Sequence, residues 1–334
     1  MDRPATRIER SAWLLAGLAL FFVLKLHLLP SLLAGLLVFE LVHILAPPLE
    51  RHLSSRRAKI AVVLLLAVLV VAVVVAGTVL AVGFFHSGGG LAALAQRMAD
   101  TIEDARLWLP GWLLAMLPDS VDQMKDAAAQ WLREHAGEVG VVGKEAGIAF
   151  AHVLIGMVIG AMVALREAVG SDGMRPLAAA LAGRARRLAE AFRRIVFAQV
   201  RISALNTAFT AIYLAVVLPL FGVPLPLTKT MIALTFVAGL LPVIGNLISN
   251  TVIVVVSLAQ SPQVALASLG FLVVIHKLEY FLNARIVGSR ISAKAWELLL
   301  AMLAMEAAFG LPGLVAAPIY YAYVKDELSS AGLV

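Results

Sequence analysis

Long apolar segments, separated by short polar or glycine-rich ones, run along the whole chain. An α-helix of roughly 20 apolar residues spans a bilayer, and about six segments approach that length. They are residues 12–29, 31–46, 60–85, 146–165, 202–220 and 264–281. The pattern predicts an all-α, polytopic membrane protein with about six full or near-full membrane helices. Pro30 separates the first two helices, which are short, and we expect them to form a hairpin.

Two further apolar segments, residues 227–259 and 296–324, are each interrupted near the middle. The first contains Leu241-Pro-Val-Ile-Gly-Asn246, and the second contains Phe309-Gly-Leu-Pro-Gly313. Proline removes a backbone donor and glycine relaxes the chain, so a helix cannot continue unchanged through either sequence. In lipid, the freed backbone groups are tolerated only where protein or a water-lined cavity satisfies them. Paired interruptions of this kind indicate the binding site of a transporter.

The segment 86–143 differs in composition from the rest of the chain. It carries four basic and eight acidic residues, with apolar residues at helical spacing. We therefore predict a small extracytoplasmic insert of amphipathic helices there. The insert separates an N-terminal part, 1–85, which holds the first hairpin and the third membrane helix, from a C-terminal membrane domain, 144–334.

Residues 174–200 combine an apolar stripe with a cluster of arginines, which is typical of a helix at the membrane interface. We expect five of these arginines to bind anionic lipid headgroups, namely Arg184, Arg186, Arg187, Arg193 and Arg194. Basic loops stay cytoplasmic, which places both termini inside and the segment 86–143 outside. The interrupted segments can then be full crossings or re-entrant hairpins from opposite sides. The basic loop 285–294 favours re-entrant hairpins, because it then lies in the cytoplasm.

Composition narrows the class of protein further. The chain is 61% hydrophobic and 14% charged, with a mean hydropathy of +0.94, which excludes an ordinary soluble domain. Because cysteine is absent, disulfides, iron–sulfur clusters and thiolate metal sites are excluded. Without a phosphate-binding loop or a dinucleotide fingerprint, we expect no cofactor, no enzyme activity and no ATP-driven transport. The net charge of +6 reflects the orientation of the chain in the membrane and its contact with lipid headgroups. We therefore expect no nucleic-acid partner.

Ionisable residues inside a membrane segment usually face a cavity or a partner. Glu306 precedes the second interruption, where it is suited to carry a proton or a cation, or to hydrogen-bond the freed backbone. His276, Glu279 and Asn283 share one face of a helix and indicate either a polar pathway or a structural ion-pair network. We predict Glu306 and His276 as coupling residues. A His-Glu pair supplies too few ligands for a metal site, so we expect no metal.

Asn246, Ser249 and Asn250 follow the first interruption directly. The residues placed to supply the other wall are Gln199, Arg201, Asn206 and Thr207, although Arg201 can instead anchor its helix in the phosphate headgroups. Side-chain oxygens and free carbonyls at such a break coordinate a cation or a hydroxylated solute, although Asn246 can also cap the second helical arm. The predicted substrate- or ion-binding residues are Pro242, Gly245, Asn246, Ser249, Asn250, Asn206, Glu279, Asn283, Glu306, Gly310 and Pro312. In the first hairpin, the depths of Lys25 and Glu40 allow a structural pair.

Three motifs carry a resemblance to a known family: Gly239-Leu-Leu-Pro-Val-Ile-Gly245, Asn283-Ala-Arg-Ile-Val-Gly288 and Phe309-Gly-Leu-Pro-Gly-Leu-Val-Ala-Ala-Pro318. The chain resembles the autoinducer-2 exporter (AI-2E) family of bacterial permeases over essentially its whole length. The resemblance implies a multi-pass protein of the bacterial inner membrane that exports a small organic solute or exchanges a cation such as sodium for protons. It also implies a secondary transporter driven by an ion gradient.

Two other interpretations belong to different classes. The first is a non-transporting membrane scaffold that binds a partner through residues 86–143. The second, an intramembrane hydrolase using His276 and Glu279, lacks a recognisable nucleophile paired with a base. Small residues in 156–164 and the valine-rich face of 60–85 suit helix packing within or between subunits, and we expect a homo-oligomer.

Overall fold

The computed structural model describes residues 7–86, 130, 136–167, 174–241, 244–258, 260–286 and 295–333, and every element in these ranges is helical. The chain forms two compact units. Unit 1 comprises residues 1–71, 145–198 and 287–334, and unit 2 comprises residues 72–144 and 199–286. The predicted insert, 86–143, lies almost entirely outside the described residues. Each unit is described separately below.

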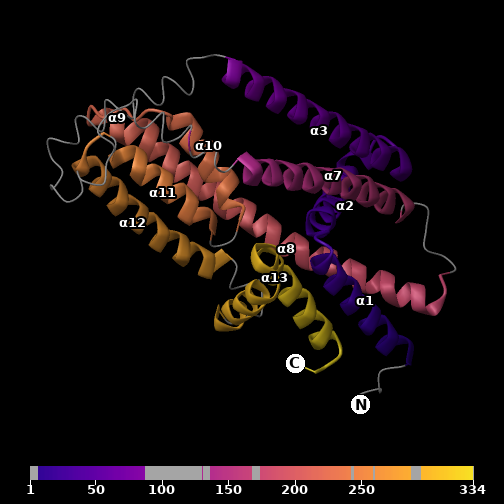
Figure 1. Ribbon diagram of the computed structural model, residues 1–334. Helices are drawn as coiled ribbons and strands as arrows, with labels where there is room; N and C mark the ends of the chain where they lie inside the picture. The colour runs from indigo at the N-terminus through magenta and orange to yellow at the C-terminus, as the bar shows by residue number, and fades with distance from the viewer. Residues whose placement is uncertain are drawn as a thin grey trace. The chain divides into compact units, whose positions relative to one another are not determined.

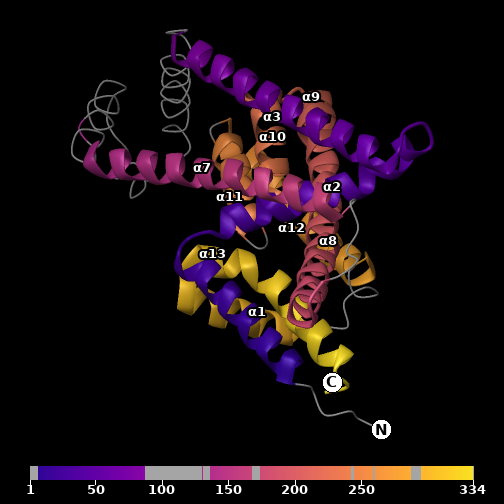
Figure 2. The same ribbon diagram turned by 90° about the vertical axis from the view of Figure 1, so that its right-hand side faces the viewer.

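The helices of the two units are shown in Figures 1 and 2. Unit 1 contains α1 (Arg7–Lys25), α2 (Leu29–Glu50), the first part of α3 (Ser55–His86), most of α7 (Ala136–Glu167), the first part of α8 (Pro176–Ile212) and α13 (Ala295–Ser330). Unit 2 contains the rest of α3 and α8, the π-helix η1 (Tyr213–Val217), α9 (Leu218–Leu220), α10 (Thr228–Gly239), α11 (Ile244–Leu258) and α12 (Pro262–Ile286).

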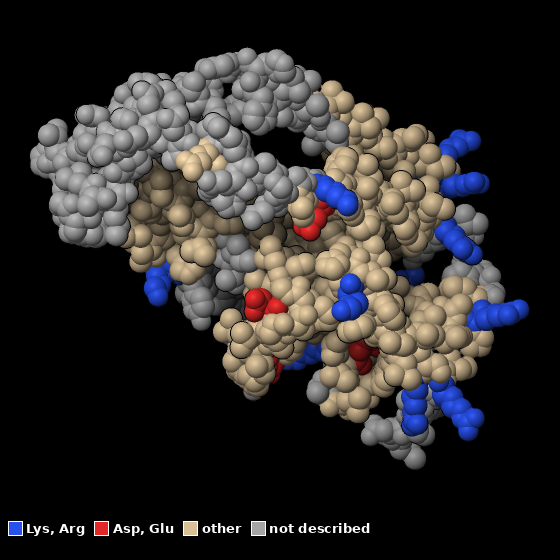
Figure 3. All heavy atoms as spheres, viewed as in Figure 1, with Lys and Arg blue, Asp and Glu red and all other residues tan. Residues whose placement is uncertain are grey.

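The all-helical membrane class predicted from sequence is confirmed by this architecture. Among the described residues, four stretches are long and apolar enough to cross a membrane: Leu29–Glu50, Lys144–Arg166, Pro176–Leu220 and Trp296–Ser330. Most of the described surface in Figure 3 is formed by residues other than Lys, Arg, Asp and Glu, and most of the Lys and Arg side chains in this view project along its right-hand edge. Large apolar side chains such as Leu64 and Met162 are more than half exposed, as expected where lipid replaces water.

Helix α8 joins two predicted helices that we expected to be separate. The basic helix 174–200 and the membrane helix 202–220 are continuous through residue 212. The reason is visible in the sequence, because no glycine or proline lies between Gly183 and Ile212 to end the helix. The apolar stripe of its first part packs on protein within unit 1, where Leu188 and Phe192 are buried against Ile319 and Tyr323 of α13.

In unit 1, α2 and α7 cross with their backbones in contact. A Cβ added at Gly35 would lie 2.9 Å from the Gly156 carbonyl oxygen, and one at Gly156 would collide with the Ser31 backbone. A Cβ at Gly160 would meet the Gly35 backbone in the same way. Small residues permit this approach, which drives helix association in lipid through van der Waals packing. Val38, Val42 and Val62 then form a shared core of α2, α3 and α7.

Helix α13 turns back on itself at Gly310, whose φ of 63° and ψ of −148° are accessible to glycine alone. Glu297 accepts hydrogen bonds from the Tyr321 hydroxyl and from Lys325 Nζ, the latter at 2.9 Å. In a straight helix, residues 297 and 325 would be about 42 Å apart. The two arms, 295–309 and 311–330, are about 22 and 30 Å long. The predicted interruption of the second segment is therefore the turn between two helical arms that lie against each other.

Unit 2 is built around a second hairpin, in which α10 and α11 pack against each other and α12 packs against α11 (Figure 1). Tyr213, Met231, Ile253 and Leu272 are central members of its core. Pro219 accounts for the π-helix η1 that precedes it, because proline lacks the N–H that would bond to the carbonyl four residues earlier. Unit 2 therefore contains two helix irregularities, the π-helix η1 and the α10–α11 break.

Replacing Gly156 by Ala should destabilise unit 1. The new Cβ would meet the Ser31 backbone, and forced overpacking of this kind costs about 1–3 kcal/mol of unfolding free energy. Thermal unfolding of the purified protein in detergent measures the loss. Gly147→Ala is the matched control on the same helix, because nothing lies within 4 Å of its Cβ position. Equal melting temperatures for the two variants would contradict the backbone contact.

Candidate functional site

The second part of α8 presents a polar stripe to the interior of unit 2. Its members recur every three or four residues and so share one helix face: Gln199, Ser203, Asn206, Thr210 and Tyr213. Ser203 and Thr210 are each 1% exposed, and Asn206 is 7% exposed. Buried polar side chains on a membrane helix need hydrogen-bond partners, either on their own helix or on neighbouring ones.

Gln199 and Ser203 supply partners for the end of α10. A helix leaves its last four carbonyls without partners from the same helix, and in α10 these belong to residues 236–239. Gln199 Nε2 donates to the Gly239 oxygen at 2.7 Å, and Ser203 Oγ donates to the Phe236 oxygen at 2.7 Å. The two remaining oxygens, of Val237 and Ala238, accept from the backbone N–H groups of residues 240 and 241. All four carbonyls at the break are thus hydrogen-bonded.

The two ends of the break are held close by glycine. A Cβ at Gly239 would lie 2.6 Å from Ser203 Oγ, so only glycine lets α8 approach α10 this closely. A Cβ at Gly245 would collide with the Ala238 carbonyl. The predicted role of Gly245 at the interruption therefore has a steric basis. Pro242 lies outside the described residues.

Asn206 and Asn246 meet beside this break, as the sequence suggested. Asn206 Nδ2 donates to Asn246 Oδ1 at 3.2 Å, which joins α8 to the first turn of α11. The Asn246 amide oxygen thus faces α8. Ser249 is buried and donates to the Gly245 oxygen at 3.1 Å, and Asn250 is half-buried. The amide pair lies beside the interruption, and both of its members are uncharged.

A chain of three hydroxyl groups continues the polar interior of unit 2. Tyr213 and Ser268 hydroxyls lie 3.0 Å apart, and the Ser268 and Ser257 hydroxyls lie 2.7 Å apart. Both serines are 0% exposed. Tyr213 also stacks on Phe271 with ring centroids 4.0 Å apart. The three linked hydroxyl groups thus connect η1, α11 and α12. Sequence reasoning missed it, because each hydroxyl lies in a different apolar segment.

The other predicted site residues lie apart from the amide pair. His276 is exposed on α12, and the side chains of Glu279 and Asn283 lie outside the described part of the chain. Glu306 is exposed on the first arm of α13 in unit 1, where Gly310 and Pro312 form the turn. The structure therefore brings together Asn206, Gly245, Asn246, Ser249 and Asn250 within unit 2. Among the described residues, no group of three or more potential metal ligands occurs.

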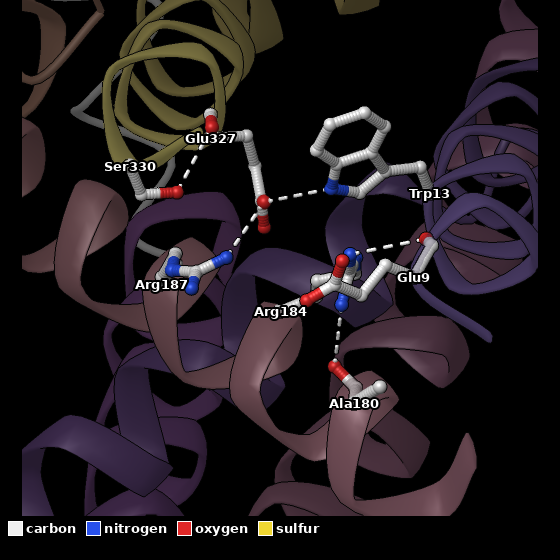
Figure 4. Close-up of polar contacts among 7 residues, drawn as sticks. All are labelled: Glu9, Trp13, Ala180, Arg184, Arg187, Glu327 and Ser330. Atoms are coloured by element: carbon white, nitrogen blue, oxygen red, sulfur yellow. Dashed lines mark hydrogen bonds and ion pairs between the residues drawn. The ribbon is translucent and has the colours of Figure 1, made fainter. Parts of the chain in front are cut away.

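The arginines predicted to bind lipid have protein contacts in unit 1 (Figure 4). Arg187 Nη1 lies 2.6 Å from Glu327 Oε2, which also accepts from Trp13 Nε1 at 3.2 Å. Arg184 is buried and donates to the carbonyls of Glu9 and Ala180 at 3.2 and 3.0 Å. These contacts tie together the ends of α1, α8 and α13.

Two further arginines extend this arrangement along α8. Arg194 pairs with Asp326, and Arg193 Nε lies 3.8 Å from Glu40, which is 4% exposed. The buried Glu40 is thus paired with Arg193. The sequence had suggested Lys25 as its partner. Arg193 and Arg186 keep exposed side chains. Sequence analysis identified the arginine face but not its partners, which include Asp326 and Glu327 of α13, more than 130 positions away.

Comparison with known proteins gives one match. Residues 12–330 match the model of the family described as "AI-2E family transporter". No curated protein and no solved structure matches the chain.

Replacing Glu327 by Gln should destabilise the junction of α1, α8 and α13. The change keeps the shape of the side chain but removes the charge that holds Arg187, and hydrogen bonds to charged groups contribute about 1.5–3 kcal/mol to unfolding free energy. Thermal unfolding in detergent measures the loss, and Glu190→Gln on an exposed site of α8 is the control.

A double-mutant cycle identifies the source of that loss. If Glu327 and Arg187 interact as described, the effects of Glu327→Gln and Arg187→Gln on unfolding free energy are not additive. Additive effects of the two changes would show that the pair contributes nothing to stability.

Proposed function

We infer that this chain, which belongs to the AI-2E transporter family, moves its substrate past the α10–α11 hairpin by alternating access. The family match spans residues 12–330, so the chain is a multi-pass membrane permease. We propose that it lies in a bacterial inner membrane with both termini in the cytoplasm, as the distribution of basic loops favours.

The arrangement at the α10–α11 break carries this proposal. The arms have 12 and 15 residues, about 18 and 22 Å, and each is too short to cross a hydrocarbon core of about 30 Å. Non-helical backbone at membrane depth is tolerated where it is buried in protein or lines a water-filled cavity. The Asn206–Asn246 pair adds side-chain donors and acceptors at this point. Broken helices of this kind form the binding sites of secondary transporters.

The α13 hairpin is proposed to supply the coupling residue. Its first arm, about 22 Å long, also falls short of a full crossing, which supports re-entry into the membrane. Glu306 is exposed on this arm one turn before Phe309. An ionisable residue in such a place faces a polar pathway or a partner, so we propose that Glu306 carries the coupling proton or cation. His276 on α12 is proposed as a second coupling residue.

The transported substrate is proposed to be a small organic solute that is exported, or a cation that is exchanged, with an ion gradient as the driving force. The polar side chains at the amide pair are uncharged, which suits either a dehydrated monovalent cation or a hydroxylated solute. Exposed Arg186 and Arg193 are proposed to contact anionic lipid headgroups, and the chain is proposed to form a homo-oligomer.

Replacing Glu306 by Gln should abolish sodium-dependent proton movement, because the amide cannot bind and release a proton. The measurement is proton flux in proteoliposomes that hold a pH-sensitive dye, with a sodium gradient imposed. Glu145→Gln, at an exposed position of α7, is the control for a lost surface carboxylate. Thermal unfolding of each variant shows whether assembly is intact.

Three outcomes are informative for the coupling proposal. Flux that survives Glu306→Gln would remove Glu306 from the coupling mechanism. A variant that fails to assemble would support a structural role for the carboxyl group. Absence of flux in the unmodified protein would reject sodium–proton exchange, and accumulation of autoinducer-2 by everted membrane vesicles would then test export of an organic solute.

A further inference from the structure

Hydroxyl groups on the helices of unit 2 commonly bond to the carbonyl four residues earlier. Thr235 donates to the Met231 oxygen at 2.8 Å, and Ser249 donates to the Gly245 oxygen at 3.1 Å. Thr251 donates to the Leu247 oxygen at 2.7 Å. This local bond satisfies a hydroxyl without any partner from another helix, so it is available to any threonine inside a helix.

Thr207 and Thr210 on α8 depart from this pattern. The hydroxyl oxygens of both are buried and have no hydrogen-bond partner within the described part of the chain. Thr210 is 1% exposed, the same as Thr235. Leaving a buried hydroxyl unsatisfied costs about 1–3 kcal/mol, although the local carbonyl was available to each. Both hydroxyls therefore remain available to a hydrogen-bond partner that is not among the described residues.

Thr210 occupies a position on α8 close to the amide pair. It lies one turn beyond Asn206, on the same face of α8, and Asn206 contacts Asn246 at the α10–α11 break. The π-helix η1 begins three residues later, at Tyr213. Helix irregularities of this type occur frequently at functional sites. The unsatisfied hydroxyls thus lie between the amide pair and an irregular segment of the same helix.

We propose that the hydroxyls of Thr207 and Thr210 line the path of the permeating solute, one turn beyond the Asn206–Asn246 pair. This proposal rests on the function proposed above and extends its site along α8. A hydroxyl both donates and accepts a hydrogen bond, and the polar groups beside it on this face of α8 are also uncharged. The path therefore offers hydrogen bonds to uncharged polar groups of the solute and to its accompanying water.

Single cysteines test the proposal directly, because the natural chain contains none. Thr210→Cys and the matched control Thr235→Cys are treated in membrane vesicles with a small, water-soluble methanethiosulfonate reagent. The reagent attacks the thiolate, which forms readily beside water and poorly in apolar surroundings. We expect Thr210→Cys to be labelled at least ~10-fold faster than Thr235→Cys, with Thr207→Cys also reactive.

Labelling of Thr210→Cys no faster than that of Thr235→Cys would overturn the proposal. Thr210→Val supplies a second measurement, since it removes the hydroxyl at almost unchanged volume. If Thr210 lines the solute path, Thr210→Val should not have a higher melting temperature in detergent than the unmodified protein. A rise above the unmodified protein would show an unsatisfied hydroxyl in a closed core, and would also overturn the proposal. Labelling requires no knowledge of the transported substrate, so a failure of sodium–proton exchange leaves its result interpretable.

Discussion

The backbone carbonyls at the end of α10 must be hydrogen-bonded, and much of unit 2 is arranged to meet that requirement. Water satisfies such groups at the end of a soluble helix, but lipid does not. Here Gln199 and Ser203 of α8 bind two of the four carbonyls, and the turn itself binds the other two. Gly239 is small enough to admit Ser203, so the interruption, the glycine and the polar face of α8 depend on one another.

Helix α8 is held by charged contacts in its first part and by uncharged contacts in its second part. In unit 1, α8 is fixed by charged contacts, with Arg187 and Arg194 paired to the end of α13. In unit 2, it is fixed by neutral contacts through amides and hydroxyls. Uncharged groups carry a smaller desolvation cost than ions, which suits them to an interior without counter-charges. The charged contacts join residues of α1, α8 and α13, and Figure 4 shows those of Arg184, Arg187 and Glu327.

The sequence was most informative where proline and glycine interrupt apolar segments. Both interruptions were predicted, because residues 241–246 and 309–313 cannot continue a helix. Asn206 was expected to face the first interruption, but its hydrogen bond to Asn246 is evident only from the structure. The polar stripe of α8 was recognised only in part, through Gln199 and Asn206. Its continuation through Ser203, Thr210 and Tyr213 was missed, because the stripe crosses the expected boundary between two helices. The partners of the arginines were missed as well, since Asp326 and Glu327 are brought to α8 only by the folding of α13.

The salt bridge between Glu297 and Lys325 sets the depth that the α13 hairpin can reach in the membrane. The residues are 28 positions apart, so they can pair only after the chain has turned at Gly310. About 20 Å of helix separates Glu297 from the turn, and about 22 Å separates Lys325 from it. A hairpin that enters the membrane turn first therefore keeps both charges near the surface, where their desolvation cost is small, and carries only its apolar part into lipid.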